Sequence, residues 1–289
     1  RVLLNKGKEF IYSHSKNSIS FINEEEKLFK VFSDEYSEEI NKKIFKNSTT
    51  LDEIVEIKAG LQAYEKGKGI PKQTEEDVKN RPYDYTYKFD EETYKYLEGN
   101  NVGRYSINWS GQYLKYGENL AAPRSVELFN GKKIIIREIT GAFPKNIIST
   151  YTEEFYLYNR SNIGIIEKEG KKIDLKYILV VLNSTLISYY FMKNTAKSVR
   201  KLFPKIILND LRKFPFKEIS LQEQQPFIEK ANKMLSLNKN LQELSQKFQR
   251  LLTRKFELEK LTTKLQDWYL LKFSEFVKEL KKSKIKLSL

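Results

Sequence analysis

The 289-residue sequence contains no cysteine and only one histidine, His14. Without cysteine there is no disulfide bond, no thiolate catalysis and no cysteine-ligated zinc or iron–sulfur site. This composition suits the reducing environment of the cytoplasm, which is the location we expect. A single histidine cannot build the usual base–nucleophile pair or zinc site. We therefore expect no catalytic, cofactor-binding or metal-ligating residue in this sequence.

Long uninterrupted apolar runs are also missing. The longest candidate, YILVVLNSTLISYYF at 177–191, contains Asn183, Ser184, Thr185 and Ser188. It is shorter than the roughly 20 apolar residues that a membrane-spanning helix requires, and no secretory signal is present. We interpret this run as a buried helix and expect no membrane partner.

Motifs that bind phosphates or flip bases are absent from the sequence. There is no G-x-G-x-x-G, no phosphate-binding loop and no Asn-Pro-Pro-Tyr. Glu56-Ile57-Lys58 and Glu169-Gly170-Lys171 each supply the carboxylate–lysine half of a nuclease-like motif, but no Pro-Asp dipeptide accompanies them. Such short patterns arise by chance in a chain rich in Glu and Lys. An autonomous nuclease is therefore only a minor alternative.

Positive charge is in excess, with 52 Lys and Arg against 38 Asp and Glu and a formal net charge of +14. Residues 101–215 contain 19 basic and 9 acidic residues, and 216–289 contain 16 and 9. Residues 1–100 contain 17 basic and 20 acidic residues. The positive field thus belongs to the middle and end of the chain, and an acidic macromolecule is the expected partner.

A basic stripe is expected in the middle of the chain. Its four residues fall at positions i, i+4, i+7 and i+8 of a helix that would run from near Ile173 through Val199. They are Lys193, Lys197, Arg200 and Lys201. A solvated helix face is the ordinary alternative. The stripe has no compensating acid at i+4 spacing, which favours phosphate contacts.

Secondary-structure signals predict an α+β fold, with mixed or antiparallel strands followed by long helices. The strongest strand is IIIREIT at 134–140, because three β-branched residues follow one another. Further strands are expected within 143–152, 154–167 and 170–173. RPYDYTYKF at 81–89 alternates aromatic and polar residues, as a half-exposed strand or hairpin arm does.

From about residue 217 the apolar spacing becomes helical. A heptad seam, interrupted by Lys255, is formed by Met234, Leu237, Leu241, Leu244, Phe248, Leu251 and Leu258. Leu261, Leu265 and Trp268 extend it in a slipped phase, and Pro226 fits the first helical turn. The seam predicts one long coiled-coil-like helix, or two. Packing on the molecule's own body and helix-mediated self-association both remain open.

Several sequence blocks, taken in order, resemble the TaqI-like C-terminal specificity domain of adenine-N6 DNA methyltransferases. The same domain occurs in enzymes that fuse methylation with restriction. The blocks lie at 55–83, 109–129, 134–166, 175–216 and 221–242. The similarity covers roughly residues 50–245 and depends on the combination of blocks.

The resemblance implies a target recognition domain that binds double-stranded DNA and presents an adenine to an upstream methyltransferase domain. In that family the upstream domain holds the S-adenosylmethionine site, so no cofactor is expected here. The chain begins with Arg1, and we expect it to be a piece of a longer polypeptide. We divide it into a lead-in or linker over 1–50, a DNA target recognition domain over 51–216 and a helical region over 217–289.

Candidate DNA contacts follow from this role. The basic stripe is assigned to phosphates. Forked donors and amides suit base edges, for which Arg124, Arg137 and Gln112 are the candidates. Tyr113 and Lys115 complete the predicted contacts. Aromatic side chains such as Tyr113 are expected to line the cleft, and basic ones such as Lys115 to give it positive charge. For each residue an ordinary surface or core role is the alternative.

The predicted function is thus a sequence-specific DNA-binding module of a site-specific adenine-N6 DNA methyltransferase in a restriction-modification system, without catalysis of its own. Whether the parent chain also cleaves DNA stays open. The alternative is a helical interaction scaffold or specificity subunit whose positive charge serves assembly.

Overall fold

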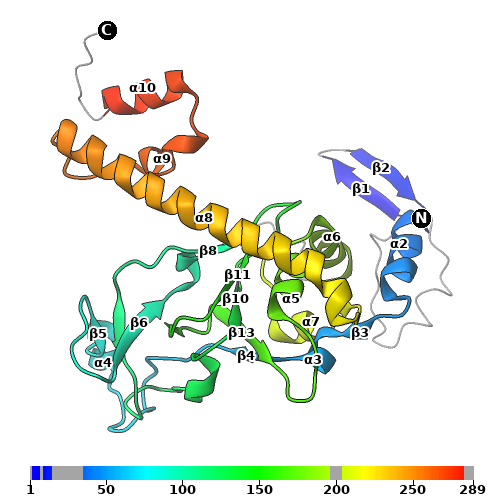
Figure 1. Cartoon of the computed structure of the whole chain (residues 1–289), viewed down its shortest axis with the longest axis horizontal. Helices are drawn as coiled ribbons and strands as arrows, with labels where there is room; N and C mark the ends of the chain where they lie inside the picture. Colours follow the sequence, from blue (N-terminus) through cyan, green and yellow to red (C-terminus); the bar gives the residue numbers. More distant parts are fainter. Residues whose placement is uncertain (1, 7–8, 15–34, 196–203, 283–289) are drawn as a thin grey trace. The chain divides into compact units, whose positions relative to one another are not determined.

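The computed structural model describes residues 2–6, 9–14, 35–195 and 204–282 (Figure 1). Its internal contacts divide the chain into two compact units, Arg1–Ala231 and Asn232–Leu289. The first unit contains the sheets, and the second unit is helical. The predicted α+β class, with a long C-terminal helix, is confirmed.

The first sheet of unit 1 has four antiparallel strands in the order β11–β10–β13–β4 (Figure 1). The bounds are β4 Val55–Ala59, β10 Lys133–Arg137, β11 Ser149–Thr152 and β13 Asn162–Glu167. Ile134, Ile135 and Ile136 of β10 are all fully buried. Because side chains alternate between the faces of a strand, this continuous burial means that both faces of β10 are covered. The strand expected here is confirmed.

Two short helices follow this sheet, α5 (Leu175–Leu182) and α6 (Thr185–Asn194), with α5 packed on β10 and β11. The expected single helix from near Ile173 through Val199 is therefore wrong. The chain bends by 63° between the two helices, and α6 ends at Asn194. Within the described residues no single helix meets the length and apolarity of a membrane span, and α5 with α6 does so only as a bent pair.

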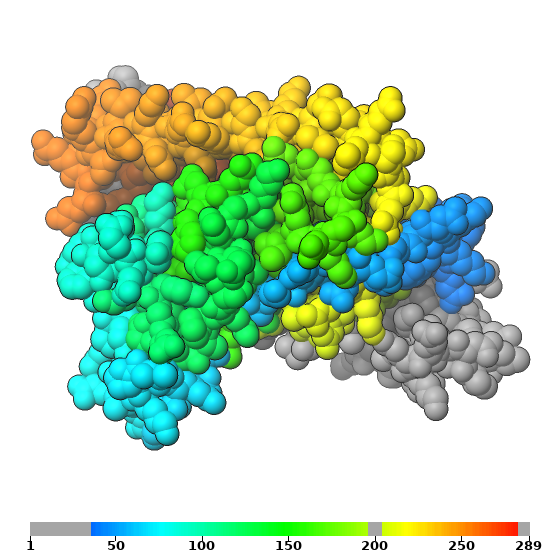
Figure 2. Space-filling model, turned by 60° about the horizontal axis from the view of Figure 1, so that its bottom comes forward, coloured from blue at the N-terminus to red at the C-terminus, as the bar shows by residue number. Residues whose placement is uncertain are grey.

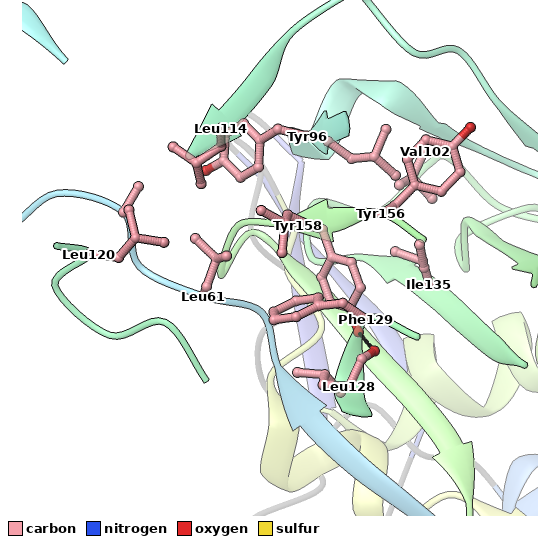
Figure 3. Close-up of a cluster of buried hydrophobic side chains, with 13 residues drawn as sticks. Leu61, Tyr96, Val102, Leu114, Leu120, Leu128, Phe129, Ile135, Tyr156 and Tyr158 are labelled. Atoms are coloured by element: carbon pink, nitrogen blue, oxygen red, sulfur yellow. Dashed lines mark hydrogen bonds between the residues drawn. The ribbon is translucent and has the colours of Figure 1, made fainter. Parts of the chain in front are cut away.

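The second sheet has the order β12–β6–β9–β5, with β12 parallel to β6 and the other pairs antiparallel. The bounds are β5 Asp84–Tyr85, β6 Thr93–Leu97, β9 Tyr113–Lys115 and β12 Leu157–Tyr158. A buried cluster that includes Tyr96, Leu114, Phe129 and Tyr158 forms its core (Figure 3). The Tyr158 hydroxyl donates to the Leu128 carbonyl at 3.0 Å, so this buried polar group is satisfied (Figure 3).

Short elements complete unit 1. They are β1 Val2–Lys6, β2 Glu9–His14, α2 Glu35–Phe45, β3 Thr49–Thr50, α3 Leu51–Ile54, α4 Glu75–Asn80, η1 Gly99–Asn101, β7 Val102–Gly103, β8 Ser106–Ile107, η2 Val126–Leu128, α7 Leu208–Arg212 and β14 Pro215–Phe216. In the space-filling view the parts of the chain coloured cyan and green lie next to one another (Figure 2). The strand expected at 170–173 is absent, because Gly170 with φ +77° belongs to a turn and the three residues after it have no regular secondary structure.

The long helix α8 spans Leu221–Lys255, drawn yellow to orange in Figure 1. Ser220 and Glu223 form its N-terminal cap, with Ser220 N donating to Glu223 Oε2 at 2.8 Å and Glu223 N donating to Ser220 Oγ at 3.3 Å. The helix therefore begins five residues before Pro226. Pro226 lies in the second turn of α8. The sequence-based expectation that it lies in the first turn is wrong.

In unit 2 the chain folds back on the second half of α8. The elements are α9 Thr263–Gln266, η3 Trp268–Leu270 and α10 Phe273–Lys282. Phe248 packs against Trp268 and Phe276, with ring centroids 4.3 and 5.9 Å away. Trp268, which belongs to the apolar stripe in slipped phase, thus covers Phe248 of the heptad seam.

Candidate nucleic-acid interface

The second sheet has one face directed to the core and one face rich in aromatic rings. Tyr85 on β5 lies opposite Tyr113 on β9, and Tyr113 lies opposite Lys95 on β6. Residues opposite each other in neighbouring strands share a face, so these three side chains form one row. The next row, with fully buried Leu114, faces the core.

Five rings make up what we call the aromatic face: Tyr85, Tyr87, Phe89, Trp109 and Tyr113. Tyr113 and Trp109 meet edge to face with centroids 5.0 Å apart. Trp109 Nε1 donates to the Gln112 carbonyl at 2.7 Å, which fixes the indole. Trp109 therefore stabilises the loop between itself and Gln112, and it is also part of a half-exposed surface.

Lys115 is ion-paired with the chain's own acidic loop. Its Nζ lies 2.8 Å from Asp90 Oδ2 and 3.7 Å from a Glu92 carboxylate oxygen. The hydrogen bond from Lys115 lowers the pKa of Asp90, and the same bond raises the pKa of Lys115. The charge of Lys115 is therefore largely balanced within the loop.

Gln112 points away from Tyr113 into a polar network. Its Nε2 donates to Asp84 Oδ2 at 2.8 Å, and the Tyr64 hydroxyl donates to Asp84 Oδ1 at 3.0 Å. Arg81 Nε lies 2.7 Å from Asp84 Oδ2. Burial raises the pKa of Asp84 above its usual value, although Arg81 opposes the rise. The amide predicted to contact a base is thus committed to Asp84.

Arg124 lies on a turn with a left-handed backbone, φ +65°. The Tyr116 hydroxyl donates to the Arg124 carbonyl at 2.7 Å, which fixes the turn and satisfies that tyrosine. Arg124 Nε donates to the Gly60 carbonyl at 3.4 Å. A side chain at Gly60 would place its Cβ 2.4 Å from the Asn159 and Tyr158 carbonyl oxygens, so glycine is required there. Arg124 itself is exposed.

Arg137 ends β10, where it lies opposite Asn162 of β13. It is half-buried, and no hydrogen bond or ion pair of its guanidinium occurs among the described residues. The adjacent Glu138 pairs instead with Lys205 at 3.1 Å. The forked donors of Arg137 are therefore available for another partner.

Of the four residues of the basic stripe, only Lys193 lies within the described residues. Lys193 lies in the last turn of α6 and is half-buried. Lys197, Arg200 and Lys201 lie outside the described residues. Their predicted alignment with Lys193 depended on a helix that ends at Asn194.

Arg104, five residues before Trp109, is a basic residue whose hydrogen bonds lie within the fold. Its Nη1 donates to the Ile147 carbonyl at 3.1 Å, and its Nη2 donates to the Asn183 carbonyl at 2.7 Å. Burial lowers the pKa of Arg104 from its ordinary value. This side chain joins the entry to β11 to the end of α5.

Sequence reasoning missed Tyr85, Tyr87, Phe89 and Lys95 as site candidates. For the three aromatic residues the signal was present in the alternation of RPYDYTYKF at 81–89, which had been interpreted only as a strand or hairpin arm. Lys95 lies beyond this stretch, on β6. Within the described residues β5 contains only Asp84 and Tyr85. Tyr87 and Phe89 thus lie in the loop beyond the strand, where their rings are 58% and 53% exposed.

The nuclease-like carboxylates are not assembled into a metal site. Glu56 forms an ion pair with Lys58 at 2.8 Å, and Glu169 is exposed near the turn at Gly170. In the described part of the chain, no three His, Asp or Glu side chains are grouped to hold a metal ion. The geometry gives no support to the nuclease alternative.

Two family models match the chain. Residues 94–216 match the TaqI-like C-terminal specificity domain, and residues 220–289 match a domain of unknown function, DUF8810. The resemblance of the central segment to the TaqI-like specificity domain is thus confirmed. All the predicted DNA-contacting residues lie within 94–216. A comparison with curated proteins found no match.

Solved structures with similarity to this chain include three from type I restriction-modification work. One is a chain described with the complex assembly and conformational transition of the type I R-M system (12% identity, 76% of this chain and 50% of that chain, TM-score 0.40). The HsdS subunit from Thermoanaerobacter tengcongensis has 10% identity over 84% of this chain and 49% of its own (TM-score 0.36). The S subunit from M. genitalium has 16% identity over 74% and 46% (TM-score 0.37). This chain thus spans about half the length of each.

Proposed function

We propose that this chain is the sequence-specific double-stranded DNA-binding module of a site-specific adenine-N6 DNA methyltransferase in a restriction-modification system. The match of residues 94–216 to a TaqI-like specificity domain carries the proposal. The net charge of +14 supports a polyanionic partner. S-adenosylmethionine would bind the methyltransferase domain or subunit with which this module works.

Two arginines suit base recognition best. Neither Arg124 nor Arg137 pairs with a carboxylate among the described residues, so each keeps forked donors for a base edge. Gln112 would first have to leave Asp84. We assign phosphate contacts to Lys193, Lys197, Arg200 and Lys201, whose charges would fix the register on the duplex.

Fluorescence anisotropy of the full chain with duplex DNA at several salt concentrations tests this function. Binding should weaken steeply with salt, because each phosphate contact releases counterions. Lys197→Glu with Arg200→Glu should weaken binding and flatten the salt dependence. The matched pair Lys278→Glu with Lys281→Glu, exposed on α10, should change neither. Absence of salt-dependent duplex binding in the unaltered chain would overturn the proposal.

A specific observation favours the second candidate, an interaction scaffold that self-associates through its helices. On α8 a row of apolar side chains remains exposed at Met234 (40%), Leu237 (52%), Leu244 (61%) and Leu251 (56%). An apolar row at heptad spacing on a helix surface is typical of a helix–helix contact. This role is compatible with DNA binding by the other unit.

A further inference from the structure

The exposed rings of the second sheet are unusual for a surface. Tyr87 and Phe89 are more than half exposed, and Tyr85, Trp109 and Tyr113 beside them are partly exposed. Single exposed apolar residues are ordinary, but clustered ones mark a binding surface. Neither the predicted base contacts nor the basic stripe uses these rings, apart from Tyr113.

The rings are ordered as a stacking surface. Tyr85 and Phe89 are stacked with centroids 4.8 Å apart and an interplanar angle of 13°. Tyr87 closes the group, 6.1 Å from Tyr85 and 6.3 Å from Phe89. Because Tyr85 is fixed in β5 and Phe89 packs on it, the loop rings are held in place without being buried. Flat π faces that are already positioned lose little entropy when another flat group binds.

The charges around the aromatic face are balanced by pairs within the chain. Lys95 Nζ lies 5.2 Å from the Trp109 ring and pairs with Glu154 at 3.2 Å. Lys115 lies 5.9 Å from the Phe89 ring and pairs with Asp90. A ligand of this face would therefore gain more from stacking than from attraction between opposite charges.

We propose that the aromatic face binds unstacked nucleobases of a single-stranded DNA segment. This rests on the proposed function, in which DNA is the partner of the specificity domain. Base–aromatic stacking accepts every base, because each has a π face. The nearby acids Asp90, Glu91 and Glu92 are paired with Lys88 and Lys115, so they offer little to a basic peptide. The chain's net charge of +14 favours a polyanion as the partner that carries the flat groups.

Trp109 offers a direct reporter, since the chain has only two tryptophans, Trp109 and Trp268. In a Trp268→Phe background of the full chain, a short oligothymidylate should quench Trp109 fluorescence to saturation. Removal of one stacking ring costs about tenfold in affinity, so Tyr87→Ala with Phe89→Ala should weaken binding of the oligonucleotide about 100-fold. Both rings are more than half exposed, and an unchanged circular dichroism spectrum would confirm that the variant is folded.

The control is Phe273→Ala, which removes a ring that is 78% exposed in unit 2 and should leave binding unchanged. Salt dependence separates the two kinds of DNA contact. Binding of oligothymidylate, which depends mainly on stacking, should fall less with salt than binding of a blunt duplex. Equal oligothymidylate affinity for the double variant and the unaltered chain would overturn the inference. So would a loss of methyltransferase binding by this variant with unchanged oligothymidylate affinity, which would assign the face to a protein contact.

The same titrations keep this inference separate from the proposed function. Loss of duplex binding alone, with the oligothymidylate response intact, would count against the specificity role and not against the aromatic face. Duplex binding with no quenching of Trp109 by oligothymidylate would remove the aromatic face and leave the specificity role intact.

Discussion

The side chain of Gln224, near the start of α8, accepts a hydrogen bond at Oε1 from the backbone N–H of Asp174 at 2.8 Å. Asp174 is the N-cap of α5, and its Oδ1 accepts from Lys176 N at 2.6 Å. Gln224 Nε2 donates to the Ile219 carbonyl at 2.9 Å and to the Lys172 carbonyl at 3.2 Å. One fully buried amide thus joins the beginnings of two helices.

Gln224→Ala should lower the free energy of unfolding by about 2–3 kcal/mol, because it leaves the Asp174 N–H and two carbonyl groups without their partner. Chemical denaturation measures the change. Gln225→Ala is the matched control: Gln225 is exposed on the next position of the same helix, and its loss should change stability by less than about 0.5 kcal/mol. Equal effects of the two variants would contradict the structural role of Gln224.

Lys133 should make stability depend on pH in the alkaline range. It is fully buried at the start of β10, where its Nζ donates to the Glu154 carbonyl at 2.7 Å and the Gly131 carbonyl at 3.0 Å. Burial lowers the pKa of Lys133 from 10.5 to about 8. Between these values the unfolded chain holds a proton that the folded chain has released, so stability rises as pH increases through this window.

The gain from Lys133 should amount to roughly 2–3 kcal/mol by the upper end of that window. Lys133→Met, of similar length and without charge, should remove this rise. Urea midpoints of the two proteins across the alkaline range measure the difference. Parallel pH profiles would show that Lys133 does not lose its proton on folding.

Part of this fold follows directly from local sequence. Ile134–Ile136 form a strand because consecutive β-branched residues suit an extended backbone that is covered on both faces. The helix expected through 177–191 is interrupted because Asn183 hydrogen-bonds Ser149 twice, its Nδ2 donating to the Ser149 carbonyl at 3.0 Å. Ser184 then caps α6 by accepting from Ile187 N at 3.2 Å. Asn183 and Ser184 were visible in the sequence as residues that can end and begin a helix, but the apolar residues around them favoured one continuous helix.

The candidate site was less predictable, because its character depends on tertiary pairing. Sequence alone could not show that Gln112 is bound to Asp84, or that Lys115 is paired with Asp90. Both acids are distant from their partners in the chain and became neighbours through the pairing of β5, β6 and β9. Nor could sequence alone show that Glu138, next to Arg137, pairs with Lys205, while the Arg137 guanidinium has no such pair among the described residues.

Self-association through α8 is tested by its exposed apolar row. Leu244→Lys with Leu251→Lys places two charges in the row and should shift the full chain to monomer, because a buried unpaired charge is costly in a helix–helix contact. Ser236→Lys with Glu243→Lys has the same seven-residue spacing at exposed polar positions of α8 and should leave the mass unchanged. Light scattering measures both. A monomeric unaltered chain would refute the contact.

Arg137 should contribute more to the sequence specificity of DNA binding than to the affinity for DNA in general. It reaches the end of β10 without a carboxylate partner among the described residues, and an arginine fork that bonds a base edge is worth about 1–3 kcal/mol of discrimination. Arg137→Ala should therefore weaken binding of the preferred duplex by about 10- to 100-fold. Binding of unrelated duplexes, which depends on phosphate contacts, should fall much less.

The preferred duplex is first found by selection from a randomised pool with the unaltered chain, and competition titrations then give the affinity ratio for each variant. Arg124→Ala, made in parallel, shows whether the second candidate arginine recognises a different position of the site. Arg212→Ala is the control, because its guanidinium already bonds within the fold, with Nη2 donating to the Ile57 carbonyl at 3.4 Å and Nε lying 3.3 Å from Asp52. An equal loss for preferred and unrelated duplexes in Arg137→Ala would place this guanidinium on a phosphate and not on a base.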